Sequence, residues 1–282
     1  MTHNELKLLS ARLYQANRQD VPSILAEFSA GASGDWRKYG LRLANFADAD
    51  YQGKLPYQVI VKGNSKLPFY AFSALPLVSC PGAGACAKWC YSLKAWRTPG
   101  AYYRQLQNTL LLRHAPERVA EAFQSIPQGA TFRLYVDGDF DTSATMGFWF
   151  ALLFSRSDIK AYGYSKSWGL FMSHHKADSP FPSNYTLNLS SGGNMDTFLP
   201  LMKALPCVRG EFVAVPIKLD KKLPNAIKYS SAEYKTKTRA AAKAQGMDKV
   251  FLCPGNCGTC TKFGHACGSA RFANIPIVIG IH

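Results

Sequence analysis

The sequence has no long hydrophobic run and few charged residues. No apolar stretch approaches the ~18 residues that span a bilayer, and the N-terminus lacks a basic segment followed by an apolar one. This pattern argues against membrane association and against a secretory leader. Charged residues make up only 18% of the 282 residues while hydrophobic residues reach 47%, which excludes a disordered chain. We therefore expect a cytoplasmic protein with a full hydrophobic core.

Acidic residues are scarce relative to basic ones. The 33 Lys and Arg against 18 Asp and Glu leave a net charge of +15. Such an excess attracts polyanions, most often nucleic acid, because phosphate contacts release counterions. The most basic stretch, residues 218–249, is typical of a loop followed by a basic helix. We predict that it contacts nucleic acid, DNA more than RNA, through Lys218, Lys221, Lys222, Lys235, Lys237, Arg239 and Lys243.

Short apolar runs alternate with helical patterns after an N-terminal helical arm, residues 1–55. The expected strands are 57–61, 69–73, 132–136, 161–164, 185–189, 212–217, 249–252 and 275–281. The expected helices are 4–18, 102–114, 116–124, 144–155, 196–204 and 232–245. This alternation predicts an α/β domain over residues 56–282, a full or partial (β/α) barrel with mostly parallel strands.

Polar residues follow several of these strands, where ligands collect in parallel α/β folds. We predict catalytic roles for Asp137, Asp139 and Lys166. The loop Ser190, Ser191, Gly192, Gly193 and Asn194 precedes a helix and is the candidate cofactor-binding segment, because its amides can receive an anion.

Each of these assignments has an alternative. Asp137, Asp139 and Asp141 could instead share one face and hold magnesium for phosphodiester cleavage, or Asp137 or Asp141 could cap the helix that begins near Thr142. Lys166 could be an exposed lysine, and the Ser-Gly loop an ordinary turn. We interpret the adjacent His174 and His175 as part of a surface loop.

Seven of the eight cysteines fall into two groups. The first group is Cys80, Cys86 and Cys90, and the second is Cys253, Cys257, Cys260 and Cys267. Cytosolic cysteine clusters usually hold metal rather than form disulfides. The Gly and Pro residues between them keep the backbone tight, so that peptide N–H groups can point at sulfur. Cys207 stands apart and is expected in the core.

The metal could be an iron–sulfur cluster or zinc. A structural zinc site with four cysteines prefers paired CxxC hooks, and only Cys257 and Cys260 form one. This favours one or two iron–sulfur clusters of the [4Fe–4S] type, with zinc as the alternative. His265 lies between two candidate ligands and could either join them or be solvated.

The ordered set C-P-G-A-G-A-C-A-K-W-C-Y, R-L-Y-V-D-G-D-F-D, Y-G-Y-S-K-S, N-L-S-S-G-G-N and C-P-G-N-C-G-T-C resembles the phage gene-product-88-like family over about residues 65–268. The resemblance implies origin in a phage or plasmid and supports metal binding. The CxxxCxxC spacing of Cys253, Cys257 and Cys260 is also similar to the motif of radical S-adenosylmethionine (SAM) enzymes, where it holds three irons of a [4Fe–4S] cluster. In those enzymes the motif follows the first barrel strand, whereas here it lies near the end of the chain. That second resemblance implies SAM as a further candidate cofactor.

Three functions fit these observations. The first is an iron–sulfur enzyme, radical-SAM-like, that acts on or near nucleic acid. The second is a non-enzymatic DNA-binding protein, stabilised by iron–sulfur or zinc, for plasmid or phage maintenance or for interference with host defence. The third is a metal-dependent nuclease that uses Asp137, Asp139 and Asp141. Aromatic residues interleaved with basic ones after Cys86, such as Trp89 and Tyr91, could stack on bases or shield a cluster from water.

Overall fold

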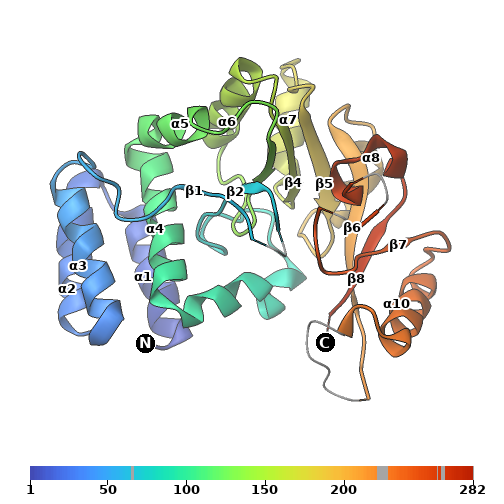
Figure 1. Ribbon diagram of the computed structural model, residues 1–282, viewed down its shortest axis with the longest axis horizontal. Helices are drawn as coiled ribbons and strands as arrows, with labels where there is room; N and C mark the ends of the chain where they lie inside the picture. The colour runs from blue at the N-terminus through green and yellow to red at the C-terminus, as the bar shows by residue number, and fades with distance from the viewer. Residues whose placement is uncertain (65–66, 221–227, 259, 262–263, 282) are drawn as a thin grey trace.

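The computed structural model describes residues 1–64, 67–220, 228–258, 260–261 and 264–281. Its centre is one eight-stranded sheet with the order β1-β2-β3-β4-β5-β6-β8-β7 (Figure 1). The strands are β1 Ile60–Val61, β2 Tyr70–Phe72, β3 Thr131–Leu134, β4 Lys160–Ser165, β5 Tyr185–Ser190, β6 Val208–Pro216, β7 Phe251–Leu252 and β8 Ile277–Ile281. Each overlaps one of the expected apolar runs.

The sheet is parallel except at one edge. β1 pairs antiparallel with β2, and every other neighbouring pair is parallel. The predicted α/β fold is therefore confirmed. Among the described residues the pairings leave β1 and β7 as edges, so the sheet is open rather than a closed barrel. All seven parallel strands end at the same edge, which places the predicted polar loops together.

Most of the helices lie where the sequence patterns predict them. They are α1 His3–Gln15, α2 Val21–Ala30, α3 Gly34–Asp48, α4 Pro99–His114, α5 Pro116–Gln124, α6 Ser143–Ser155, α7 Trp168–Lys176, α8 Leu199–Lys203 and α10 Ala232–Ala244. Short 3-10 segments are η1 Arg18–Asp20, η2 Ala85–Trp89, η3 Tyr91–Arg97, η4 Asp196–Phe198, η5 Ala266–Gly268 and η6 Ala270–Phe272. None of the described helices combines the length and apolar character needed to cross a bilayer.

Two local expectations are wrong. His174 and His175 belong to helix α7 rather than to a surface loop, because buried Trp168 and Phe171 anchor that short helix in the core. Neither Asp137 nor Asp141 caps α6. Its cap is Thr142, whose hydroxyl accepts a hydrogen bond from the amide of Thr145.

The two faces of the sheet are covered differently. Side chains alternate along β3, so Phe132 and Leu134 enter the main core that α1 to α7 also form. Arg133, between them, faces the opposite side. There Tyr162 of β4 packs in a second, smaller core with residues of the C-terminal segment. Helices thus cover one face, and the cysteine-rich segment lies against the other.

Candidate metal and ligand site

The second cysteine group begins where β7 ends. The amide of Cys253 continues the strand ladder by donating to the carbonyl of Val278, at 2.8 Å. Cys253, Cys260 and Cys267 all belong to or pack against the second core, beside Tyr162. Cys257 interacts electrostatically with Tyr162 as well. The fold therefore brings all four predicted ligands of this group into one neighbourhood.

Glycines let the backbone fold tightly around these sulfurs. Gly255 and Gly258 have positive φ values of 78° and 93°. A Cβ at Gly258 would lie 2.6 Å from Cγ of Pro68, so any larger residue there collides with the chain ahead of β2. The amide of Ala266 donates to Sγ of Cys260 at 3.3 Å. Peptide N–H groups directed at sulfur are therefore present, as predicted.

Thiols of this group have shifted ionisation in the metal-free protein. Burial, with a smaller contribution from neighbouring thiols, raises the pKa of Cys253 to about 11 and that of Cys267 to about 12. Buried cysteines with such pKa values are neutral until a metal binds, and metal binding would release their protons. All eight cysteines are free thiols.

The side chains of the second cysteine group do not converge on one metal position. In the described ranges, no three Cys, His, Asp or Glu side chains meet closely enough to hold a metal ion. His265 stands against the rings of Phe69 and Tyr162, with centroids 4.7 and 4.5 Å away. Its Nδ1 accepts a hydrogen bond from the amide of Gly268, and burial lowers its pKa to about 4. His265 is therefore a neutral, packed side chain rather than a solvated one.

The first cysteine group lies in the loop after β2. This loop is joined to the loop after β5, because the amide of Cys86 donates to the carbonyl of Gly192 at 3.2 Å. Asn194 adds two bonds in return: its amide donates to the carbonyl of Gly82, and its side chain donates to the carbonyl of Pro81. A Cβ at Gly84 would lie 2.6 Å from the backbone of Gly193. The glycines of C-P-G-A-G-A are thus required for this close contact.

Cys80 also faces the loops after β3 and β4. Its thiol interacts electrostatically with Asp139, Cys90 and Lys166, and burial raises its pKa. The loops after four parallel strands, β2 to β5, therefore meet around the first cysteine group, as the topology predicts. The second group lies at the same edge of the sheet, after β7.

Asp139 is buried and fully engaged by hydrogen bonds. Its Oδ1 accepts from the hydroxyl of Ser165 at 2.7 Å and from the amide of Phe140 at 2.8 Å, and its Oδ2 accepts from the amide of Lys166 at 2.7 Å. Burial raises the pKa of Asp139, and these donors oppose the rise. The contacts join the loops after β3 and β4.

The other two aspartates point elsewhere. Asp137 accepts from Gln105 of α4 at 3.0 Å and from Ser73 at 3.3 Å, and burial raises its pKa. Asp141 accepts from the hydroxyl of Tyr14 of α1 at 2.7 Å. The three carboxylates do not form a metal-binding group in the part of the chain that the structure describes.

Lys166 and the candidate cofactor-binding loop contact each other. The ammonium of Lys166 donates to Oγ of Ser190 at 2.6 Å. Lys166 is therefore not a freely exposed lysine. Ser191 accepts from the amide of Ala214 at 3.1 Å. The amides of Gly192 and Gly193, which were expected to receive an anion, donate instead to the carboxylate of Asp196.

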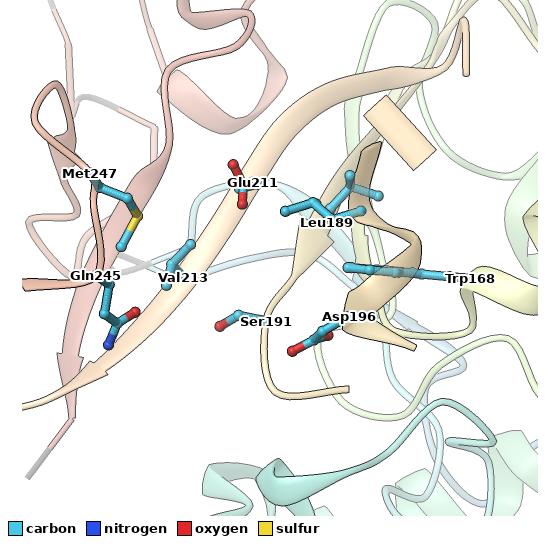
Figure 2. Close-up of a pocket in the computed structure, with 9 residues that line it drawn as sticks. Trp168, Leu189, Ser191, Asp196, Glu211, Val213, Gln245 and Met247 are labelled. Carbon is cyan, nitrogen blue, oxygen red and sulfur yellow. The ribbon is translucent and has the colours of Figure 1, made fainter. Parts of the chain in front are cut away.

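Of the five predicted cofactor-binding residues, only Ser191 lines the described pocket beside this loop. Figure 2 shows Ser191 and Asp196 on one side of the opening, with Gln245 and Met247 across from them. The pocket has a volume of about 190 Å³. It is lined by Trp168, Leu189, Ser191, Asp196, Leu199, Glu211, Val213, Gln245 and Met247. This volume suits a small molecule only, since typical ligand pockets have about 300–1,000 Å³.

The predicted basic surface is partly present on α10. Lys235, Arg239 and Lys243 are exposed and four residues apart, so they form one stripe along the helix, while Tyr234, Thr238 and Ala242 are buried. Lys218 is exposed as well. Lys237 differs, because it forms ion pairs with Asp220 at 2.7 Å and with Glu233 at 2.9 Å. Lys221 and Lys222 lie outside the described residues.

Sequence reasoning missed three residues on the face of the sheet that the cysteine segment covers. They are Arg133 of β3 and Tyr162 and Tyr164 of β4. The Arg133 guanidinium lies over the ring of Tyr164, 4.8 Å from its centroid. One signal was available, because a charged residue between two core residues of a buried strand requires a partner on the other face.

A family model described as "Gene product 88" matches residues 43–275. No curated protein and no solved structure matches the chain.

Proposed function

The chain belongs to the gene product 88 family, and from its cysteine arrangement we propose that it is a cytoplasmic iron–sulfur protein of a mobile genetic element. The observation that carries the proposal is the gathering of Cys253, Cys257, Cys260 and Cys267 beside one small core, although they are spread over fifteen residues. Four free thiols, one buried and three partly buried, beside one core are a typical cradle for a metal–thiolate centre.

Iron–sulfur binding accounts for this cradle better than zinc does. The amide of Ala266 already donates to Sγ of Cys260, and such N–H···S bonds tune the potential of a cluster. Aromatic side chains, Tyr162 and Phe69 among them, shield the group from water. Zinc needs no such tuning, and the chain supplies only one CxxC hook.

The first cysteine group supports a second, reactive centre. Cys80, Cys86 and Cys90 provide three thiolates, so a four-iron cluster there would keep one iron open for a ligand. We propose a radical-SAM-like enzyme with SAM as that ligand, although the spacing of this group, CxxxxxCxxxC, differs from the CxxxCxxC of radical-SAM enzymes. Lys166 and Asp137 are the candidates for contact with the bound molecule, and Asp139 positions Lys166 by accepting its backbone amide. The enzyme would act on or near nucleic acid.

Metal analysis tests the proposal directly. Protein prepared without oxygen should be brown and contain iron and sulfide, about eight irons if two [4Fe–4S] clusters form. Cys257→Ala should remove about half of the iron, and so should Cys86→Ala. Cys207→Ala is the matched control, because Cys207 is a core residue only 6% exposed, and it should leave the iron content unchanged. Colourless protein with stoichiometric zinc would refute the proposal.

A non-enzymatic DNA-binding role is the second candidate, and a specific observation favours it. Lys235, Arg239 and Lys243 of α10 form an exposed stripe, and no carboxylate pairs with them in the described chain. A second basic surface lies beside the first cysteine group, in a stretch from Tyr51 to Pro116 that contains no Asp or Glu. There Trp89 and Tyr91 are 40% and 56% exposed.

Two triple variants compare these surfaces. Replacing Lys235, Arg239 and Lys243 by Gln should weaken binding to duplex DNA and lower the slope of log K against log salt by about 2.7, or 0.9 per phosphate contact. Replacing Lys88, Lys94 and Arg97 by Gln should instead weaken single-strand binding, since exposed aromatics beside cations are typical of single-strand sites. Binding that is insensitive to salt in the wild type would exclude both roles.

A further inference from the structure

Two buried hydrogen-bond donors lack a strong acceptor on the face of the sheet beside the second cysteine group. They are Nε of Arg133, which has no partner among the described residues, and the hydroxyl of Tyr162, which has only the Cys257 thiol, a weak acceptor, beside it. Buried donors are nearly always paired in native proteins, because an unpaired one loses its bonds to water without replacement. Two of them close together therefore indicate an acceptor that the described residues do not supply.

The two donors are held side by side by the sheet. Arg133 and Tyr162 are register partners on the neighbouring parallel strands β3 and β4, so their side chains leave the same face next to each other. Tyr162 is 1% exposed, and its ring is fixed against Phe69 and His265. Arg133 is half-buried as a residue, and its Nε is buried.

The charges around Arg133 favour an anion. The guanidinium lies over the ring of Tyr164 and within electrostatic reach of Tyr91 and Cys257. Burial raises the pKa of the nearby carboxyl group of Asp137, and Arg133 opposes this rise electrostatically. Asp137 accepts hydrogen bonds from Gln105 and Ser73 rather than from Arg133. The hydroxyl of Tyr91 donates to the carbonyl of Val136. The guanidinium is thus held over Tyr164, and its Nε has no hydrogen-bond partner among the described residues.

We propose that Arg133 and Tyr162 bind an oxyanion, the carboxylate or phosphate group of a small-molecule ligand, directly beside Cys257. A guanidinium fork and a phenol hydroxyl in one place match the two or three acceptor atoms of such a group. The oxyanion would lie beside the guanidinium, close to Tyr91 and Tyr164, which interact with Arg133. This inference deepens the proposed function by naming the class of substrate that the metal centre faces.

Anion binding to the anaerobically prepared protein tests the site. Inorganic phosphate and acetate serve as probes in calorimetric titrations, and one of them should bind once per chain. Arg133→Gln should weaken this binding about tenfold or more, because a charge-assisted pair is lost, and Tyr162→Phe should weaken it several-fold. Arg37→Gln is the control, since Arg37 is exposed on α3 and should bind like the wild type.

Two further measurements separate the possible failures. Melting curves and iron content are recorded for every variant, so a variant that has unfolded or lost its cluster is identified. Tyr162→Phe retains the buried ring and thereby tests the site even if Arg133→Gln does not fold. Binding that both variants leave unchanged would overturn the proposal. So would a wild type that binds neither probe while Arg133→Gln loses iron, because the missing acceptor would then be the cluster itself.

Discussion

The amide of Gly193 donates a hydrogen bond of 3.1 Å to Oδ1 of Asp196, and the neighbouring amide of Gly192 donates one of 3.0 Å to Oδ2. One carboxylate thus occupies the two amides that a bound anion would use. It also fixes the loop whose carbonyl at Gly192 accepts from Cys86. The loop after β5 therefore supports the first cysteine group, and the two hydrogen bonds to Asp196 stabilise the conformation of this loop.

We predict that Asp196→Ala loosens this support. Two charge-assisted bonds are lost, so the free energy of unfolding should fall by about 2 kcal/mol, measured by urea denaturation. High concentrations of phosphate should restore part of the loss, because the freed amides can then donate hydrogen bonds to a bound anion. Asp248→Ala, at an exposed position, is the control. Equal stability of the two variants would show that the Asp196 bonds contribute nothing.

The strands and most helices could be predicted because their cause is local. β8, for example, is a β-branched run, and α10 carries Tyr234, Thr238 and Ala242 at a spacing of four residues. The sequence also predicted that the polar loops lie at one edge of the sheet, because the carboxyl ends of parallel strands lie at the same edge. Helix α7 was missed because its anchor is tertiary: Trp168 and Phe171 fill the main core, and the remaining sequence favours a turn.

The side-chain contacts within the site could not be predicted in the same way. Asp139 looked like a free carboxylate at a strand end, but its oxygens are engaged by Ser165 and by the Lys166 amide from the next strand. The pairing of Arg133 with Tyr162 depends on the register between β3 and β4, which no short motif encodes. Residues that meet across strands become visible only once the strands are aligned.

The contact between the loops after β2 and β5 leads to a prediction at Gly84. In Gly84→Ala the new Cβ would lie 2.6 Å from the backbone of Gly193, and backbone atoms cannot move aside cheaply. We expect a loss of about 1–3 kcal/mol in the free energy of unfolding and a lower iron content. Gly147→Ala is the matched control, because Gly147 is an exposed helical glycine with nothing within 4 Å, and Ala there should stabilise by about 0.5–1 kcal/mol.

The stability of the protein should depend on pH through His114, the last residue of α4, whose ring stacks on Tyr51 of the helical arm. Burial lowers the pKa of His114 in the folded protein, and the nearby Arg113 and Arg18 lower it further. The unfolded chain therefore binds a proton more readily than the folded one. The free energy of unfolding should fall as the pH drops below about 6.5, until the folded-state pKa is passed. His114→Gln should flatten this part of the pH profile in urea denaturation, and an unchanged profile would contradict the prediction.

The last prediction concerns metal removal and follows from where the second cysteine group lies. Phe251, Cys253, Cys260, Ala266 and Cys267 of the segment from Val250 to Gly268 pack in a small core around Tyr162, whereas α1 to α7 form the main core on the other face. Removing the metal with a chelator under anaerobic conditions should therefore raise hydrogen exchange in this segment, while β3 and α4 remain protected. Cys207→Ala should show the same metal-dependent difference as the wild type, and Cys260→Ala should show none. If protection of this segment is the same with and without metal, the four cysteines are not its ligands, and the small core alone holds the segment on the sheet.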